Sequence, residues 1–262
     1  MKNVSGRIVL IPLTIASMLL ILISLREPSL SRSWDEDVRV LAGVEVSNND
    51  VVTLNQIRDW SYEIGSISSR NYFDASFDPE DIVALWMYEQ PLNASGLIAH
   101  TFLVFEFDPS YKRGRYLGLS VETRREQGEE YSIIGGAFRS FEITHIWATE
   151  KDLVTRRVQY LDYPLTRYRL EIPATYRSRI FLKFVRETQG LASLPRWYNT
   201  ASNNCTSSLI QYVNESEPGA IPFHYSYIFT GKVDEYLERL GYKAADYSLH
   251  ITREFLDSDD LR

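Results

Sequence analysis

The chain has 262 residues, of which 44% are hydrophobic and 24% are charged; these proportions are typical of globular proteins and exclude a disordered or low-complexity chain. Its formal net charge is −7, and because Lys2, Arg7 and Arg26 give the first 26 residues a charge of +3, the remainder carries about −10. A chain this acidic offers no basic surface for nucleic acid, which we exclude as a partner.

An uncharged apolar segment, residues 8–25, lies near the N-terminus. Its 18 residues are at the lower end of the roughly 17 to 25 that span a bilayer as a helix. Lys2 and Arg7 precede it and several acidic residues follow, which favours a cytoplasmic N-terminus and a periplasmic domain. Residues 1–26 are therefore predicted to be a single-pass inner-membrane anchor. A cleavable signal peptide is the alternative, although no small-residue cleavage pattern follows the segment.

The next residues predict a linker and a domain rich in strands. Residues 27–37 are polar with Pro and Ser, and they read as a linker before one domain over residues 38–245 and a C-terminal tail over residues 246–262. Alternating or β-branched stretches predict strands within residues 43–54, 72–77, 82–88, 98–108, 115–122, 142–149 and 166–172. The clearest hairpin joins 98–108 to 115–122, and a turn centred near residue 111 places His100 opposite Glu122.

Beyond residue 173 the apolar residues recur with a period of about 3.6, which is typical of helices. Helices are predicted over residues 174–188, 204–214 and 231–241. In the second of them Asn203 or Asn204 is suited to cap the N-terminus, so that Cys205 lies in the first helical turn. The expected fold is therefore α+β, with an antiparallel sheet packed against helices.

Cys205 is the only cysteine, so the chain forms no intramolecular disulfide. A thiol at a helix N-terminus faces unpaired backbone N–H groups and the positive end of the helix dipole, both of which favour the nucleophilic thiolate. The same N–H groups can stabilise the oxyanion of an acyl-transfer intermediate. The alternative is that Cys205 is a small buried hydrophobic residue, which is a common fate of a single cysteine.

A thiol nucleophile needs a base, and four histidines are candidates. His100 begins a predicted strand, and Glu122 across the hairpin is placed to accept its second ring N–H and fix the tautomer. His145 lies in an alternating stretch, His224 in a predicted loop and His250 near the C-terminus, so each is a weaker candidate. A core or edge histidine without a catalytic role remains the alternative for His100.

Several common signatures are missing from the sequence. One cysteine and four scattered histidines lack the ligand spacing of a structural zinc site, and the HExxH motif does not occur. Neither a G-x-S-x-G elbow nor a Walker-type loop occurs. We therefore expect no metal and no cofactor.

Two further groups of polar residues are candidates for substrate binding. Arg124 and Arg125 follow Glu122 and suit a phosphate or a carboxylate, although an exposed charged turn explains them equally well. Tyr198, Asn199 and Asn204 flank the cysteine and can donate to the oxyanion or position the substrate, with capping and packing as the alternative.

Three segments, WYNTASNNCTSSL around Cys205, IAHTFLVFEF around His100 and LSVETRREQGEEYS between them, resemble the bacterial Lnb N-terminal periplasmic domain family. The resemblance extends from Trp34 to Tyr242. It implies a circularly permuted, papain-like thiol enzyme of the NlpC type, in which the histidine strand precedes the cysteine helix. In that arrangement Cys205 is the nucleophile, His100 the general base and acid, and Glu122 the group that orients the histidine.

Characterised Lnb proteins are lipoprotein N-acyltransferases, which move an acyl chain from a phospholipid through a thioester to the α-amine of a lipidated N-terminal cysteine. The resemblance thus implies a thiol-dependent acyltransferase at the outer face of the inner membrane, with a membrane phospholipid as donor and a lipoprotein or other amine as acceptor. Two alternatives stay open: a cell-wall peptide amidase or peptidase of the NlpC type, and a non-catalytic, membrane-anchored binding module.

Overall fold

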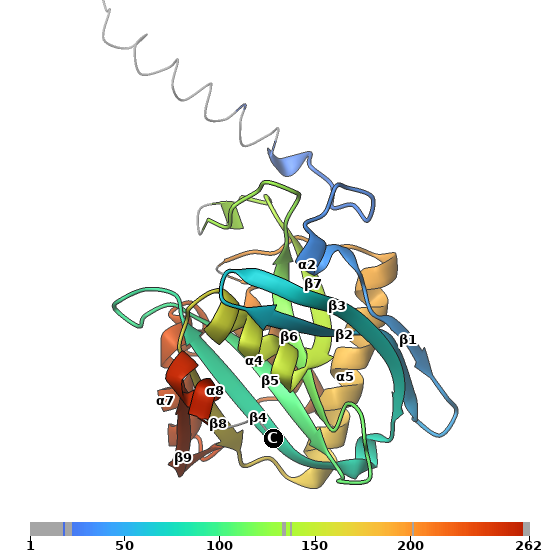
Figure 1. Ribbon diagram of the computed structural model, residues 1–262, viewed down its shortest axis with the longest axis vertical. Coiled ribbons are helices and arrows are strands. Elements are labelled where there is room, and N and C mark those ends of the chain that lie inside the picture. Colours follow the sequence, from blue (N-terminus) through green and yellow to red (C-terminus); the bar gives the residue numbers. More distant parts are fainter. Residues whose placement is uncertain (1–17, 19–22, 133–134, 137, 201, 259–262) are drawn as a thin grey trace, which may run out of the picture.

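The computed structural model describes residue 18 and residues 23–258, apart from residues 133–134, 137 and 201. The described chain is a mixed α+β fold in which one large sheet has helices on both faces (Figure 1). The strands are β1 (Gly43–Val46), β2 (Val52–Glu63), β3 (Ser66–Phe77), β4 (Ile82–Pro91), β5 (Ala99–Phe107), β6 (Tyr116–Arg124), β7 (Glu142–Thr149), β8 (Leu165–Leu170) and β9 (Lys243–Ile251). The α-helices are α2 (Glu36–Arg39), α4 (Glu150–Thr155), α5 (Ala174–Ser193), α6 (Cys205–Ser216), α7 (Val233–Arg239) and α8 (Arg253–Ser258).

The strand order is β1-β2-β7-β6-β5-β4-β8-β9, and β3 pairs with β2 beside this path. Most pairs are antiparallel, but β2 and β7 pair in parallel, with Arg58 opposite Ala148. The expectation of an antiparallel sheet is therefore corrected to a mixed sheet. The physical reason is that the direction of each strand is set by its antiparallel neighbours. Strands β1 and β3 set the direction of β2, and β6 sets the direction of β7. Where β2 and β7 meet, the two strands run the same way.

The central strands are buried on both faces, which explains their nearly continuous apolar sequence. One apolar layer lies between the sheet and helices α5 and α6, where the ring centroids of Phe105 and Phe181 are 5.1 Å apart. The other lies under α4, where Tyr88 and Phe102 stack at 4.7 Å. Each such ring contributes about 1.5–3 kcal/mol through burial, so the two layers hold the sheet rigidly between the helices.

The predicted helices are confirmed, since α5 and α6 begin where the apolar period begins and α7 is preceded by a short 3-10 turn, Thr230–Lys232. The predicted tail over residues 246–262 contains most of β9 and all of α8 in its described part. Strand β9 pairs with β8, and α8 places Phe255 and Leu256 against the layer under α4, where Ile251 is fully buried. The alternation of apolar and polar residues in this segment is too short to predict a strand. The segment becomes part of the sheet because β8 offers an edge with which β9 can pair.

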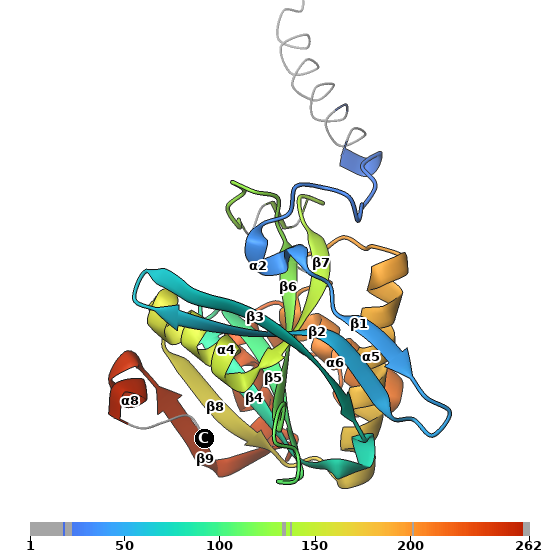
Figure 2. The same cartoon turned by 45° about the vertical axis from the view of Figure 1, so that its right-hand side comes forward.

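Most of the predicted anchor, residues 8–25, lies outside the described residues. Within the described part of the chain, no helix is long and apolar enough to cross a membrane. Residues 27–39 form a segment that we call the strap. The strap includes the predicted linker, residues 27–37, and it is packed against the domain, since Trp34 is 3% exposed and the backbone N–H of Asp35 donates to the carbonyl of Arg125 at 2.8 Å. Helix α2 of the strap lies beside the end of β6 (Figure 2).

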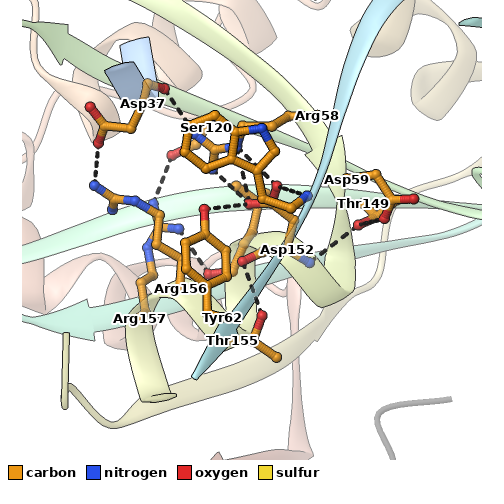
Figure 3. A network of polar contacts seen from close by, with 12 residues as sticks. Asp37, Arg58, Asp59, Tyr62, Ser120, Thr149, Asp152, Thr155, Arg156 and Arg157 are labelled. Carbon is orange, nitrogen blue, oxygen red and sulfur yellow. Dashed lines mark hydrogen bonds and ion pairs between the residues drawn. The ribbon is translucent and has the colours of Figure 1, made fainter. Parts of the chain in front are cut away.

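A buried ion pair joins the strap, β2 and α4 (Figure 3). The Arg58 guanidinium donates to both oxygens of the Asp152 carboxylate, at 2.7 Å to Oδ1 and 3.0 Å to Oδ2. The backbone N–H of Trp60 donates to the same carboxylate at 2.8 Å, and Arg58 Nη1 donates to the carbonyl of Asp37 at 2.9 Å. Because both charges are satisfied by several partners, the pair fixes α4 relative to the sheet.

We expect Asp152→Ala to lower the free energy of unfolding by about 3–5 kcal/mol, since it leaves the Arg58 charge buried without its partner. Urea denaturation at constant slope measures this loss. A control is Glu217→Ala, which removes an exposed ion pair with Arg179 and should cost at most about 1 kcal/mol. Equal losses in the two variants would show that Asp152 has no special role.

Candidate active site

Cys205 is the first residue of α6, as the sequence predicts. Asn204 caps the helix: its side-chain oxygen accepts from the backbone N–H of Ser207 at 2.7 Å, and the Ser207 hydroxyl accepts from the backbone N–H of Asn204 at 2.9 Å. This reciprocal pair satisfies two of the backbone donors that a helix N-terminus leaves without partners. The thiol therefore lies in the positive field of the helix N-terminus.

His100 on β5 lies between Cys205 and Glu122. Its Nε2 hydrogen-bonds the Ser120 hydroxyl at 2.8 Å and is 3.3 Å from Glu122 Oε1. The β5–β6 pairing ends at Phe102 and Ser120, and two residues further in the same register His100 falls opposite Glu122, as the sequence predicts. His100 and Cys205 are close enough for each to shift the pKa of the other. The hydroxyl and the carboxylate engage the Nε2 atom of His100.

The ionisation of the two residues is coupled. Burial lowers the pKa of His100, but the negative charges of Glu122 and Cys205, with hydrogen bonds to both, outweigh burial and raise the pKa to about 9. Burial raises the pKa of Cys205, but the charge and hydrogen bond of His100, the Thr101 backbone N–H and the Thr206 hydroxyl together lower it below its ordinary value. The thiolate and imidazolium forms therefore stabilise each other near neutral pH.

Glu122 is held as a carboxylate. Its Oε1 accepts from the Ser120 hydroxyl at 2.7 Å and from Arg157 Nη2 at 2.7 Å. Burial raises the pKa of Glu122, but the charge and hydrogen bond of His100 and the charge of Arg157 bring the pKa well below its usual range. Sequence reasoning missed both Ser120 and Arg157. The spacing of Ser120 two residues before Glu122, on the same strand face, is a signal for the first; the sequence gives none for the second.

A cavity of about 580 Å³ opens beside Cys205, His100 and Glu122. Its volume is within the roughly 300–1,000 Å³ of small-molecule sites. Its walls come from segments that are distant in the sequence, namely residues 35–37 of the strap, Trp60 and Tyr62 of β2, and residues 92 and 98 around the β4–β5 loop. The cavity thus depends on the assembled fold and not on the β5–β6 hairpin alone.

The predicted substrate-binding residues divide into two groups. Arg125, Tyr198 and Asn204 line the cavity, whereas Arg124 and Asn199 do not. Arg124 is 4% exposed, and its guanidinium donates to the carbonyls of two strap residues, at 3.1 Å from Nε and 2.8 Å from Nη2. Its predicted role as a phosphate clamp is therefore corrected to a structural one. The Asn199 side chain accepts from the backbone N–H of Ser202 at 3.0 Å and orders the loop before α6.

The three residues that do line the cavity are already engaged in contacts. Arg125 forms ion pairs with two residues of the strap, at 3.3 Å to Asp37 and 3.6 Å to Asp35. The Asn204 amide donates to two backbone carbonyls, at 2.9 and 3.0 Å, which fixes its capping orientation. Burial, followed by the charge of Cys205, raises the pKa of Tyr198 well above its usual range. The Tyr198 hydroxyl therefore stays protonated beside the thiol.

The remaining histidines lie away from the cavity. His145 is buried in the core, where its Nδ1 hydrogen-bonds the Thr188 hydroxyl at 2.9 Å. Burial lowers the pKa of His145 to about 3, so its ring is neutral. His224 interacts with the Ser226 hydroxyl at 3.0 Å at the start of a 3-10 turn, and His250 lies on β9. His100 is thus the histidine that the fold brings to Cys205.

The family model of the Lnb N-terminal periplasmic domain matches residues 68–254. The matched segment contains Cys205, His100 and Glu122, as well as Ser120 and Arg157. It begins within β3 and leaves out the strap, β1 and β2. Comparisons with the curated proteins and with the solved structures found no match.

We expect iodoacetamide to alkylate Cys205 at pH values below those required by an unperturbed thiol, whose pKa is about 8.5. The lowered pKa of Cys205 keeps the thiolate populated as the pH falls, until the thiolate itself is protonated. In His100→Ala the imidazolium is lost and burial remains, so the alkylation profile should move to higher pH.

Mass spectrometry of the alkylated chain gives the rate at each pH. His250→Ala is the control, since this ring lies on β9 outside the cavity, and it should keep the wild-type profile. An unchanged profile in His100→Ala would separate His100 from the reactivity of the thiol.

Proposed function

The chain belongs to the Lnb N-terminal periplasmic domain family, and we propose that it is a thiol-dependent acyltransferase that carries an acyl group on Cys205. The observation that carries the proposal is the row of Cys205, His100 and Glu122 at the edge of a 580 Å³ cavity. A thiolate next to a protonated histidine is the pair of groups that acyl transfer through a thioester requires. We further propose a phospholipid donor and a lipoprotein or other amine acceptor.

The proposed reaction has two halves. The Cys205 thiolate attacks the carbonyl carbon of the donor ester, and His100 gives its proton to the departing alkoxide, which leaves a thioester on Cys205. The acceptor amine then attacks the thioester carbonyl, His100 takes a proton from the amine, and the thiolate is released as the amide forms. In both halves the backbone N–H groups at the start of α6 face the developing oxyanion, and each donor of this kind contributes roughly 3 kcal/mol in acyl-transfer enzymes.

A second, apolar cavity supports an acyl substrate. It encloses about 390 Å³ between the sheet and helices α5, α6 and α7. Leu209, Ile210 and Val213 line it at helical spacing along α6. Thr101 and Thr206, the residues after His100 and Cys205, also line it, and their hydroxyls are 2.9 Å apart. A long alkyl chain suits this cavity, whereas a polar cell-wall peptide does not.

The sequence supports a substrate in the membrane. The predicted anchor of residues 8–25 ends next to the strap, and the strap contributes residues 35–37 to the catalytic cavity. A single-pass inner-membrane protein with a cytoplasmic N-terminus would hold the cavity close to the periplasmic surface of the bilayer. Phospholipids and lipidated proteins are the acyl donors and acceptors available there.

We expect the full-length protein, incubated with phospholipid vesicles, to gain the mass of one acyl chain on Cys205. Mass spectrometry of the intact chain and of its peptides locates the thioester. Cys205→Ser should lose both the thioester and turnover to an amine acceptor while keeping the fold, because serine has nearly the same volume but does not readily form the anion.

Transfer at the wild-type rate in Cys205→Ser would refute covalent thiol catalysis. Cleavage of soluble cell-wall peptides without any acyl adduct would instead support the amidase alternative.

We expect Val213→Trp to disfavour long acyl chains, because the larger side chain fills the apolar cavity beside α6. Overpacking of this kind costs about 1–3 kcal/mol, so the ratio of long-chain to short-chain thioester should fall by at least about fivefold. Gln211→Trp on the exposed face of the same helix is the matched control. Equal chain-length ratios in the two variants would exclude this cavity as the acyl-chain site.

A further inference from the structure

We propose that Arg157 is a positioning residue that holds the Glu122 carboxylate against His100 and so keeps the pair of Cys205 and His100 assembled. The inference rests on the proposed function, since it concerns how the same site is kept in its reactive arrangement. Arg157 does not itself touch Cys205, and its effect on the thiol passes through Glu122 and His100.

The surroundings of Arg157 fix the direction of its guanidinium. The side chain is 1% exposed, and its cationic carbon lies 4.5 Å from the centre of the Phe102 ring. Nη1 donates to the carbonyl of Leu153 at 2.9 Å, and Nη2 donates to the Ser120 hydroxyl at 3.1 Å and to Glu122 Oε1 at 2.7 Å. A buried cation requires a charged partner, and Glu122 is the carboxylate that Arg157 contacts.

A local feature of the backbone aims Arg157 at the site. The chain leaves α4 through a π-helical turn, Arg156–Tyr160, and such turns are frequent at functional sites. Within this turn two consecutive arginines reach different partners. Arg156 pairs with Asp37 of the strap (Figure 3), whereas Arg157 reaches Ser120 and Glu122. The strap therefore holds the turn from one side while the catalytic carboxylate holds it from the other.

One carboxylate oxygen of Glu122 receives the contacts from Ser120, Arg157 and His100. Glu122 Oε1 accepts from Ser120 at 2.7 Å and from Arg157 at 2.7 Å, and it lies 3.3 Å from His100 Nε2. The Glu122 side chain is 23% exposed, so without Arg157 the carboxylate can turn towards water. With Arg157 in place, positive and negative charges alternate along the row from Arg157 through Glu122 and His100 to Cys205. Each charged group is therefore held by its neighbour in the row.

The test uses the full-length chain and the rate at which iodoacetamide alkylates Cys205 at pH 7, which requires no acyl donor. Arg157→Met and Glu122→Gln should each slow alkylation by roughly tenfold, and the double variant should be no slower than the slower single variant, because both changes break the same contact. A double variant whose loss equals the product of the two single losses would overturn the proposal.

Arg167 provides a matched control. It is buried to a similar degree and lies over Trp86 in the same apolar layer, but its carboxylate partner is Glu150, at 3.8 Å. Arg167→Met should leave the alkylation rate nearly unchanged, and its effect should multiply independently with that of Glu122→Gln. Coupling of the same size for Arg167 would mean that any buried arginine in this layer acts on the thiol, which would also overturn the proposal.

Arg157→Lys keeps the charge and tests the proposal if Arg157→Met does not fold. If Arg157→Lys alkylates at the wild-type rate, the proposal is supported. It is also supported if Arg157→Lys slows alkylation of the wild type but causes no further slowing when added to Glu122→Gln. If Arg157→Lys slows alkylation equally in both backgrounds, the proposal is overturned. The proposed function is tested separately. If the wild-type protein forms no acyl thioester, the proposed acyltransferase activity is refuted, but the coupling between Arg157 and Glu122 is not. Lost coupling with an intact thioester removes only the role of Arg157.

Discussion

The pairing of β5 with β6 is the constraint on which the site depends. Successive side chains of a strand point to opposite faces, so a shift of one residue in this pairing would move His100 away from Glu122. The register also brings Ser120 to the histidine ring and leaves Thr101 on the opposite face, against Thr206 of α6. One hairpin thereby contributes polar groups to the cavity beside Cys205 and to the lining of the apolar cavity.

Two buried arginines of this protein are paired with carboxylates. Arg58 and Asp152 satisfy each other next to α4, and a few residues further along the chain Arg157 and Glu122 do the same. Isolated ions of this kind would be strongly destabilising inside a protein, but each here has a charged partner and further hydrogen bonds, to backbone groups for Arg58, Asp152 and Arg157 and to the Ser120 hydroxyl for Glu122. Helix α4 and its π-helical turn therefore contribute buried charges to the site as well as apolar side chains to the core.

The parts that sequence predicted are those set by local patterns. The hairpin of β5 and β6, the start of α6 and the opposition of His100 to Glu122 follow from alternation, turn residues and capping, all of which act over a few residues. Long-range contacts decide the rest. Arg157 reaches Glu122 from a helix that no local pattern indicated, β2 meets β7 in parallel, and Arg124, which looked like a ligand for phosphate, is held by the strap.

The strap and β2 also bear on what counts as a complete domain. The matched family segment starts at residue 68, yet residues 35–37, Trp60 and Tyr62 form part of the cavity wall. A fragment cut at the family boundary would expose the edges of β3 and β7 that β2 covers, and unpaired edges of this kind promote aggregation. The part of this chain that builds the cavity therefore begins in the strap, before the region that the family model matches.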